Sequence, residues 1–198
     1  MKAKELIEKF RKSESKIVVT ELVSMFAYSE NIDSQVADNN LTFRTEIVEE
    51  LLNDFSSIDV ELIRKIFDEE LKCELSTRRH DNLYQLCFYL FKIGELEDVF
   101  LIYDAKFNSK NMDVGTMLDS EMMYLNQPID NVISFVKLQL NEKPELNEKY
   151  KTILNELNNL KRHPNYNLSE YSTFINGYFF GHENQIETKL TKKWWKFW

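Results

Sequence analysis

The 198-residue chain is poor in the residues that break helices and build tight turns. It has four glycines and three prolines, too few for a many-turned β-sandwich or barrel, a collagen-like chain or a low-complexity segment. No apolar run approaches the roughly 20 residues of a membrane-spanning helix. The N-terminus, MKAKELIEKFRK, also lacks the apolar core of a signal peptide. The sequence therefore predicts a mostly helical cytoplasmic protein.

Cysteine and histidine are scarce as well, with two and three residues. Cys73 and Cys87 have no second pair or neighbouring histidine and are expected to be reduced thiols in the core. His80, His163 and His182 match no zinc-binding pattern, and no glycine-rich phosphate loop is present. These absences predict no metal site and no cofactor, and they argue against an enzyme.

Charge is negative overall and unevenly distributed. The net charge is -8 with a pI near 5.1, which argues against a nucleic-acid-binding protein. Residues 17–74 contain 14 acidic and four basic residues, whereas the last ten residues contain four lysines and no acid. The acidic block favours basic partners, and the basic tail needs a separate interpretation.

Apolar residues recur at helical spacing along most of the chain. One expected helix carries a single apolar face; its residues are Val18, Val19, Leu22, Val23 and Phe26. Others are expected around residues 2–12, 47–55, 62–71, 83–91, 96–107, 118–125, 132–140 and 153–160. Gly94 is expected to end a helix in left-handed conformation, Pro128 to open one, and His163-Pro164 to end another.

This pattern predicts an all-α fold, an irregular stack of antiparallel helical hairpins similar to an α-solenoid, with residues 1–188 as one domain. The signatures of tetratricopeptide and ankyrin repeats are missing. The segment YSTFINGYFF leaves two alternatives. Asn176-Gly177 could close a small β-hairpin near residues 172–180, or the segment could be one aromatic helix that ends at Gly177 or Gly181.

The richest polar group brackets the turn between two expected helices; its members are Asp104, Lys106, Asp113, Asp119 and Glu121. Three interpretations are open: solvated charges and helix caps, contact with a partner protein, or metal binding and catalysis. Acids of the expected helices at 47–55 and 62–71 are further candidates for partner contact. The turn lacks the alternating acids of a calcium-binding loop.

The last ten residues, KLTKKWWKFW, form a basic and aromatic tail at 189–198. Docking on this protein or a partner, weak peripheral contact with an anionic membrane, and stacking on nucleic acid are the alternatives. The candidate contact residues are Lys192, Lys193, Trp194, Trp195, Phe197 and Trp198.

The stretch from Leu83 to Val136 contains a series of short motifs, Gly94-Glu95, Ala105-Lys106, Met112-Asp113 and Leu118-Asp119, placed on successive helices and turns. In this order they resemble immunity-type helical proteins of bacterial polymorphic toxin systems. The resemblance covers about a quarter of the chain and implies inhibition of a toxin by direct binding.

An acidic helical surface that steers a basic toxin domain would agree with this resemblance. A helical scaffold or adaptor with weak membrane contact through the tail is the alternative hypothesis, and an enzyme is the third. The sequence leaves the oligomeric state open.

Overall fold

The computed structural model describes residues 1–13, 15–30, 38–76, 82–108, 112–163 and 167–181. These residues form helices and connecting turns, and no strand occurs in these ranges, so the all-α prediction is confirmed. In chain order the elements are α1 (Ala3–Lys12), α2 (Lys16–Ser24), α3 (Leu41–Leu51), η1 (Ser57–Asp59), α4 (Val60–Ser76), α5 (Asn82–Ile93), η2 (Leu96–Asp98), α6 (Val99–Tyr103), η3 (Asp104–Asn108), α7 (Met112–Met117), η4 (Ser120–Tyr124), α8 (Ile129–Glu142), α9 (Leu146–Lys149), α10 (Ile153–Arg162) and α11 (Leu168–Phe180).

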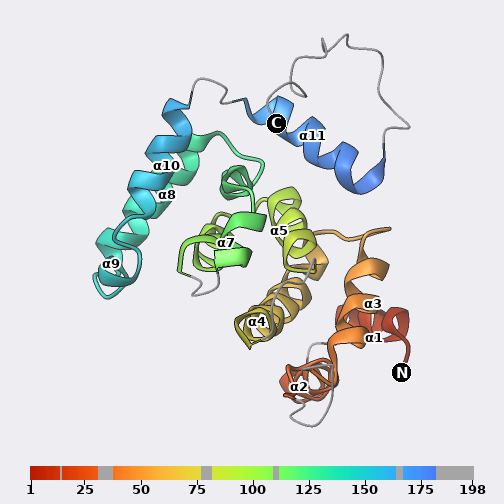
Figure 1. The fold of residues 1–198 in the computed structure, drawn as a ribbon. Helices are drawn as coiled ribbons and strands as arrows, with labels where there is room; N and C mark the ends of the chain where they lie inside the picture. Colours follow the sequence, from red (N-terminus) through yellow and green to blue (C-terminus); the bar gives the residue numbers. More distant parts are fainter. Residues whose placement is uncertain (14, 31–37, 77–81, 109–111, 164–166, 182–198) are drawn as a thin grey trace.

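Most of the helices follow one another in a curved row (Figure 1), from α1 and α3 through α4 and α5 to α8 and α10. α3 packs mainly on α1 and α5, and α4 packs on α5. α11 then turns back and lies over η4 and α5. The α-solenoid-like part of the prediction is not confirmed, since the last described helix crosses the row instead of extending it.

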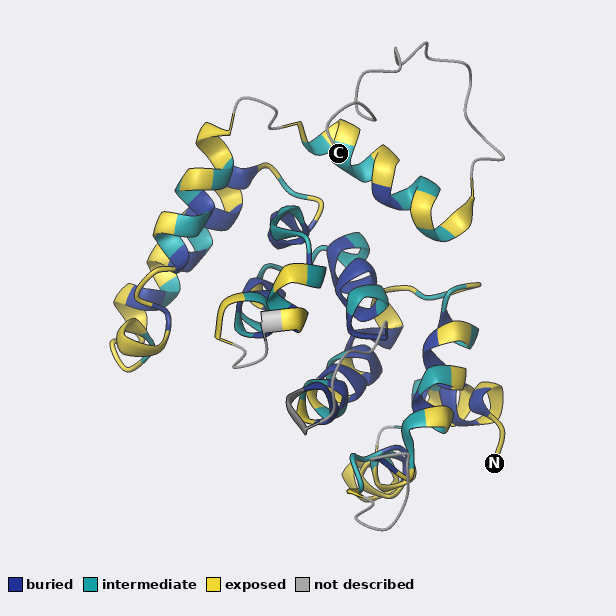
Figure 2. Ribbon diagram, viewed as in Figure 1, coloured by how far each residue is buried: buried dark blue, intermediate teal, exposed yellow. Residues whose placement is uncertain are grey.

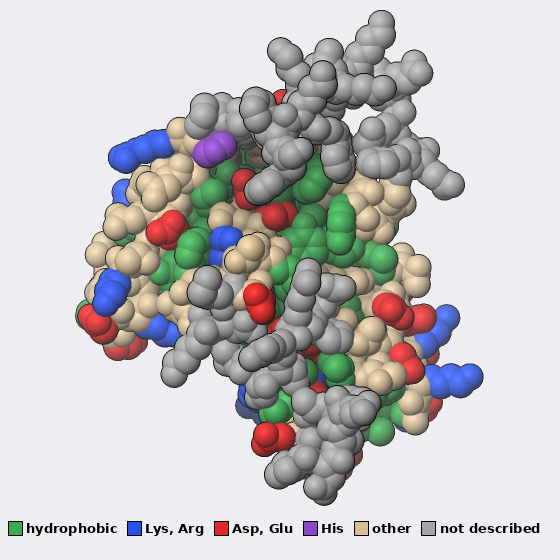
Figure 3. Space-filling model, in the orientation of Figure 1, with side chains coloured by type: hydrophobic (Ala, Val, Ile, Leu, Met, Phe, Trp, Pro, Cys, Tyr) green, Lys and Arg blue, Asp and Glu red, His purple; other side chains and the backbone are tan. Residues whose placement is uncertain are grey.

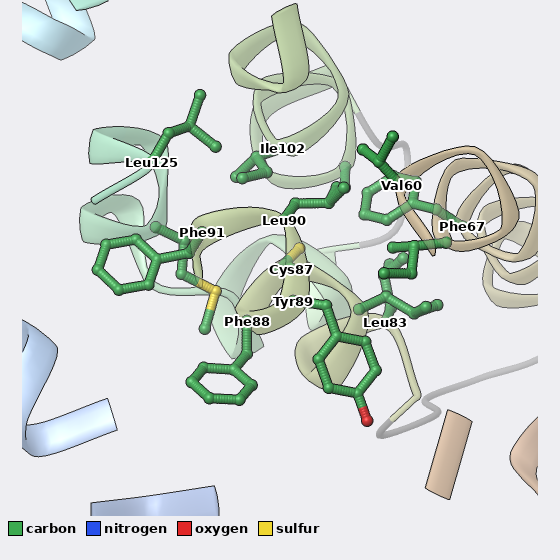
Figure 4. Packing of buried hydrophobic residues seen from close by; sticks show 14 of the residues in the cluster. Val60, Phe67, Leu83, Cys87, Phe88, Tyr89, Leu90, Phe91, Ile102 and Leu125 are labelled. Carbon is green, nitrogen blue, oxygen red and sulfur yellow. The ribbon is translucent and has the colours of Figure 1, made fainter. Parts of the chain in front are cut away.

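α5 forms the centre of the hydrophobic core (Figure 4). It is apolar on nearly every side and is buried from Leu86 to Phe91 without a break, as expected for a helix with neighbours all round. The peripheral helices are buried on one side only (Figure 2). The predicted apolar face of α8 is confirmed, because Val132, Ile133, Val136 and Leu140 are all buried.

The β-hairpin prediction near residues 172–180 is wrong. These residues belong to α11, whose first turn is capped by Asn167, the side chain of which accepts a hydrogen bond from the Glu170 amide at 3.1 Å. Gly181, at φ 75°, ends the helix, as the alternative interpretation expected. Packing decides the outcome, because Tyr171, Ile175 and Phe179 recur at four-residue spacing toward α5.

The expected helix over residues 118–125 is broken into pieces. α7 ends at Met117, Asp119 is extended at φ -76° and ψ 131°, and η4 follows as a short 3₁₀-helix. Leu125 and Asn126 then both adopt positive φ values and turn the chain toward α8. Pro128 is the N-cap of α8 and Gly94 has φ 79°, so both of these predicted helix boundaries are confirmed.

Candidate functional site

Asp119 and Lys106, two of the five predicted site residues, lie close enough for their charges to influence each other. Asp119 Oδ2 accepts hydrogen bonds from the hydroxyls of Tyr84 on α5 at 2.8 Å and Tyr171 on α11 at 3.0 Å. Burial raises the pKa of both tyrosines above the ordinary value, and the negative charge of Asp119 raises it further. The carboxylate therefore joins α11 to α5 through two neutral hydroxyl groups.

Lys106 is held by backbone carbonyls. Its Nζ donates to the Gly115 carbonyl at 2.9 Å and to the Leu118 carbonyl at 2.5 Å. Burial lowers the pKa of Lys106, and the negative charges of Asp119 and Glu121 oppose that shift. The ammonium group thus connects η3 to Gly115 and Leu118, the two ends of the short segment that precedes Asp119.

The local sequence allows this close approach at Gly115. A Cβ atom added there would lie 2.7 Å from the Lys106 carbonyl oxygen, closer than packed atoms tolerate. With glycine at this position α7 can rest directly on η3, and the lysine can reach two carbonyls of the turn. The sequence motif around Asp113 and Gly115 therefore serves packing in the first place.

Asp104 takes part in a separate group next to α9. Its Oδ2 accepts from Lys149 Nζ at 2.6 Å and from the Tyr150 hydroxyl at 2.9 Å, and its Oδ1 accepts from Asn108 at 2.7 Å. Burial raises the pKa of Tyr150. Glu121 is half-buried, and Asp113 is exposed on α7. The structure thus brings Lys106, Asp119 and Glu121 together, and it gives Asp104 other partners.

Sequence reasoning missed Tyr84 and Tyr171. Together with Asp119 and Lys106 these two tyrosines make up a polar cluster, called the Asp119 group below. Tyr84 is one of several aromatic residues on α5, and Tyr171 lies in the segment for which a hairpin was an alternative. Neither residue stands at a spacing that would indicate a shared carboxylate. Burial also raises the pKa of the nearby Cys87 thiol, which disfavours its reactive thiolate.

The Asp119 group is well suited to holding helices together. Its carboxylate has two hydroxyl donors and its ammonium group has two carbonyl acceptors, so the main polar atoms are satisfied within the protein. Within the described ranges, no three His, Cys, Asp or Glu residues are grouped so that they could hold a metal ion.

Part of the acidic block at residues 17–74 is used inside the fold. Arg44 is fully buried and pairs with Asp38 and with Glu70, the latter at 2.5 Å, and it also donates to the Phe26 carbonyl. Burial opposes ionisation of Asp38, but the hydrogen bond from Arg44 lowers its pKa overall. Asp59 is likewise buried, at 2.7 Å from Arg11. The acidic surface is therefore smaller than the sequence suggests.

Other acids of the block remain on the surface. Glu46 and Glu49 are exposed on α3, where they line an open groove against α1 together with Lys2 and Lys4. Neither glutamate forms an ion pair with a described residue. Glu49 belongs to the expected helix at 47–55 and Glu46 directly precedes it, and both side chains remain available for an outside partner.

α2 has an exposed apolar face that the sequence analysis did not identify. The prediction placed Val18 on the inward face, which is wrong, since Val18 is exposed while Leu22 and Phe26 are buried. Ile17, 74% exposed, and Met25 lie on the same outward side. At about 100° of rotation per residue, positions 17, 18 and 25 fall within one third of the helix circumference.

α11 carries a second exposed set of large side chains, Phe174, Tyr178 and Phe180, each more than half exposed. The predicted tail contacts, Lys192, Lys193, Trp194, Trp195, Phe197 and Trp198, lie outside the described residues. In the ranges that the structure covers, no helix combines the length and apolar character needed to cross a bilayer.

Comparison of the chain with protein-family models, with curated proteins and with solved structures finds no match in any of the three.

Proposed function

We propose that this chain is a protein-binding module that acts by direct contact, as a toxin-neutralising immunity protein of the type that its central segment resembles. The observation that carries the proposal is the outward face of α2. A helix that is apolar on both sides is normally buried on both sides. In α2, this chain covers the side of Leu22 and leaves Ile17, Val18 and Met25 in contact with solvent.

The chemistry of this surface favours a partner with an apolar anchor and a basic surround. Glu21 lies on α2 between Ile17 and Met25 and is exposed, and the chain as a whole carries a net charge of -8. Exposed apolar groups gathered on one face are a common mark of a contact surface. Complementary charge around them speeds association and disfavours other partners.

Neutralisation in this proposal needs no chemical step by the chain. A rigid helical surface that covers the active cleft or the substrate path of a toxin would block it by occupancy. The rigidity comes from the central core around α5 and from the buried Arg44 network behind α2. The Asp119 group has a supporting part, because it fixes the helices in place.

The test begins with the full chain as bait for partners in its native cell extract, followed by purification of the partner and measurement of its affinity. The double variant Ile17→Ser/Met25→Ser is expected to weaken that affinity by about 10–100-fold, as for the loss of two central anchors. It is expected to unfold at the same urea concentration as the wild type, since both side chains are exposed. The partner must also be toxic when expressed alone and harmless when expressed with the chain.

Phe174→Gln/Tyr178→Gln is the matched control, because it removes two exposed aromatic side chains at the opposite edge of the molecule (Figure 1). It should leave the partner affinity unchanged. Equal affinity of the α2 variant and the wild type would contradict the proposed surface. A bound partner without toxicity would contradict the immunity function and favour the scaffold or adaptor alternative.

A further inference from the structure

Two segments of the chain, 51–63 and 90–102, repeat one another in sequence. They align without a gap, 39 residues apart, and share five identical pairs: Leu51/Leu90, Asp59/Asp98, Val60/Val99, Leu62/Leu101 and Ile63/Ile102. Four of these pairs form the pattern Asp-Val-x-Leu-Ile. In each copy the aspartate is the last residue of a 3₁₀-helix, η1 or η2, and the pattern continues into an α-helix, α4 or α6.

Burial follows the same 39-residue offset. Four of the five identical pairs are buried in both copies, and so are three further pairs, Ile47/Leu86, Val48/Cys87 and Ile66/Ala105. The copies differ where α5 buries Phe88 and Tyr89, because α3 has Glu49 and Glu50 there. α5 is covered all round and α3 is not (Figure 2). The difference therefore follows from the place of each copy in the fold.

Asp59 and Asp98 have similar surroundings in the two copies. Both are fully buried. Asp59 Oδ1 accepts a hydrogen bond from Arg11 Nε at 2.7 Å, and Asp98 Oδ1 accepts one from Arg64 Nε at 2.6 Å. Arg11 belongs to α1, which packs on α3, and Arg64 belongs to α4, which packs on α5. The two arginines are not 39 residues apart, so the aspartate is the repeated element and a neighbouring helix supplies the cation.

The two ion pairs differ in how completely the carboxylate is used. Asp59 Oδ2 accepts from Arg11 Nη2 at 2.9 Å and from the Ser56 amide at 3.0 Å. Asp98 Oδ2 is also buried, but it has no hydrogen-bond partner within the described ranges. Both arginines also pair with more exposed acids, which are Asp54 at Arg11, and Glu61 and Glu95 at Arg64.

Burial separates these two pairs from ordinary surface pairs. Acidic and basic side chains also lie next to one another over α1 and α3 on the face shown in Figure 3. Lys9 and Glu5 form such a pair on α1, with both side chains about half exposed. Water screens an exposed pair, which therefore contributes little to stability. Loss of Arg11 or Arg64 instead leaves a buried carboxylate without its cation, which is costly.

We propose that α3–α4 and α5–α6 are two copies of one helical unit and that the Arg11–Asp59 and Arg64–Asp98 pairs are its joints. Each joint holds the turn inside a copy against a neighbouring helix. The first joint connects α1 to η1, and the second connects α4 to η2. Loss of one joint therefore loosens one part of the molecule and leaves the other joint in place.

The first joint also has a consequence for the α2 face, which rests on the proposed function. Arg11 lies five residues before Lys16, the first residue of α2, and α1 contacts α2. The joint thus holds the chain on one side of α2, while Arg44 holds the Phe26 carbonyl beyond its other end. Arg11 is therefore a positioning residue for the partner contact, whereas Arg64 holds η2.

Double-mutant cycles measured by urea unfolding test the joints. The cycles Arg11→Met with Asp59→Asn and Arg64→Met with Asp98→Asn should each show a coupling of about 10-fold or more in the unfolding equilibrium constant. Lys9→Met with Glu5→Gln is the control on α1 and should couple by less than about 3-fold. Coupling at either joint as small as that of the control would overturn the proposal.

Native-state hydrogen exchange shows which segment each joint holds. Arg11→Met is expected to speed amide exchange in α1 and α2 by about 10-fold or more, and Arg64→Met to do so in η2 and α6. Lys65→Met, which removes an exposed lysine next to Arg64, is the control and should exchange as the wild type does. Acceleration of the same segments by both arginine variants would contradict two separate joints.

The partner identified with the α2 variants gives the functional measurement. Arg11→Met is expected to weaken its affinity by about 10-fold, since a displaced anchor loses much of its contact. Arg64→Met should bind as the wild type does. Unchanged affinity of Arg11→Met, or unchanged exchange of its α2 amides, would overturn the positioning role. Failure of the proposed function is distinguishable, because the unfolding and exchange experiments contain no partner.

Discussion

Arg44 shows how the acidic block is balanced within the fold. The guanidinium group is fully buried with Asp38 and Glu70, which are buried as well. Removal of one member of such a group leaves uncompensated charges in the interior. The arginine therefore matters for stability even though burying charge is costly in itself.

Arg44→Leu is expected to lower the free energy of unfolding by about 3–5 kcal/mol, because Asp38 and Glu70 would lose their buried cation. Urea unfolding followed by circular dichroism measures the loss. Arg162→Leu, which removes an exposed arginine from the last turn of α10, should change the value by less than about 0.5 kcal/mol. Similar effects of the two substitutions would contradict the structural role of Arg44.

Tyr171 gives a prediction for alkaline pH. Its pKa is raised in the folded protein by burial and by Asp119, whereas an unfolded tyrosine ionises near pH 10. Between these two values the folded state holds a proton that the unfolded state has released, so stability falls as the pH rises. Below about pH 10 the contribution of the neutral hydroxyl is fully present.

Tyr171→Phe cannot ionise, so its stability should lack this pH dependence. We expect the advantage of the wild type over Tyr171→Phe to be smaller by about 1.4 kcal/mol at about pH 11 than at about pH 9. Urea unfolding of both proteins at the two pH values measures the difference. Thr173→Ala, which removes a hydroxyl from the outer side of the same helix, is the control. A constant difference would contradict the raised pKa.

At the scale of the helices, sequence periodicity predicted most elements but not where they break. The faces of α8 and α10 were readable because each helix buries one side, as at Val132, Val136 and Leu157. The segment from Leu118 to Leu125 has the same spacing yet is interrupted. Lys106 donates a hydrogen bond to the Leu118 carbonyl, and the hydroxyls of two tyrosines donate to the Asp119 carboxylate. These contacts come from distant parts of the chain and leave no local signal.

The prediction of the inward face of α2 was wrong for a related reason. Apolar residues on both of its faces allowed more than one choice of inward side, and only the contacts with the neighbouring helices select the side of Leu22. In the candidate site, Asp119 and Lys106 could be named from their polar context. Their tyrosine partners could not, because Tyr84 and Tyr171 are 87 positions apart and meet only through the return of α11.

The ends of α5 and α11 provide a matched pair of glycines. Gly94 and Gly181 both have positive φ values, 79° and 75°. A Cβ atom at Gly94 would lie 2.8 Å from the Leu125 carbonyl oxygen, whereas one at Gly181 would meet nothing within 4 Å. The same substitution therefore tests conformation alone at one site, and conformation plus packing at the other.

Gly181→Ala is expected to lower the free energy of unfolding by about 1–3 kcal/mol, the cost of a positive φ with an extended ψ of 169°, a conformation that is essentially restricted to glycine. Gly94→Ala should cost about 2–5 kcal/mol, because the turn at Leu125 must also move. Chemical denaturation of the two variants gives the comparison. Equal losses would show that the contact with the Leu125 carbonyl does not matter.

At the scale of the whole molecule, α2 and α11 each have one buried residue, Leu22 and Ile175, and different contacts connect the two helices to the core. α2 lies next to the buried Arg44 network, since Arg44 donates to the Phe26 carbonyl just beyond the helix. α11 has one fully buried residue, Ile175, and the hydrogen bond from Tyr171 to Asp119. Helices with few buried contacts open locally at a lower free energy than the core.

Native-state hydrogen exchange should therefore show that amides of α11 exchange through a local opening, well before those of α5. Ile175→Ala removes the main apolar anchor of α11 and is expected to speed exchange in that helix by 10-fold or more. Exchange in α5 should change much less, since its core contacts with α4 and with η4 stay in place. Mass spectrometry of peptic peptides resolves the two helices.

Thr173→Ala on the exposed side of α11 is the matched control, because it shortens a side chain that has no buried contact. Its exchange pattern should equal that of the wild type. If Ile175→Ala instead accelerates α5 and α11 together, α11 is part of one cooperative unit with the core. In that case α11 could not open alone, and its packing on α5 and η4 would be as stable as the core itself.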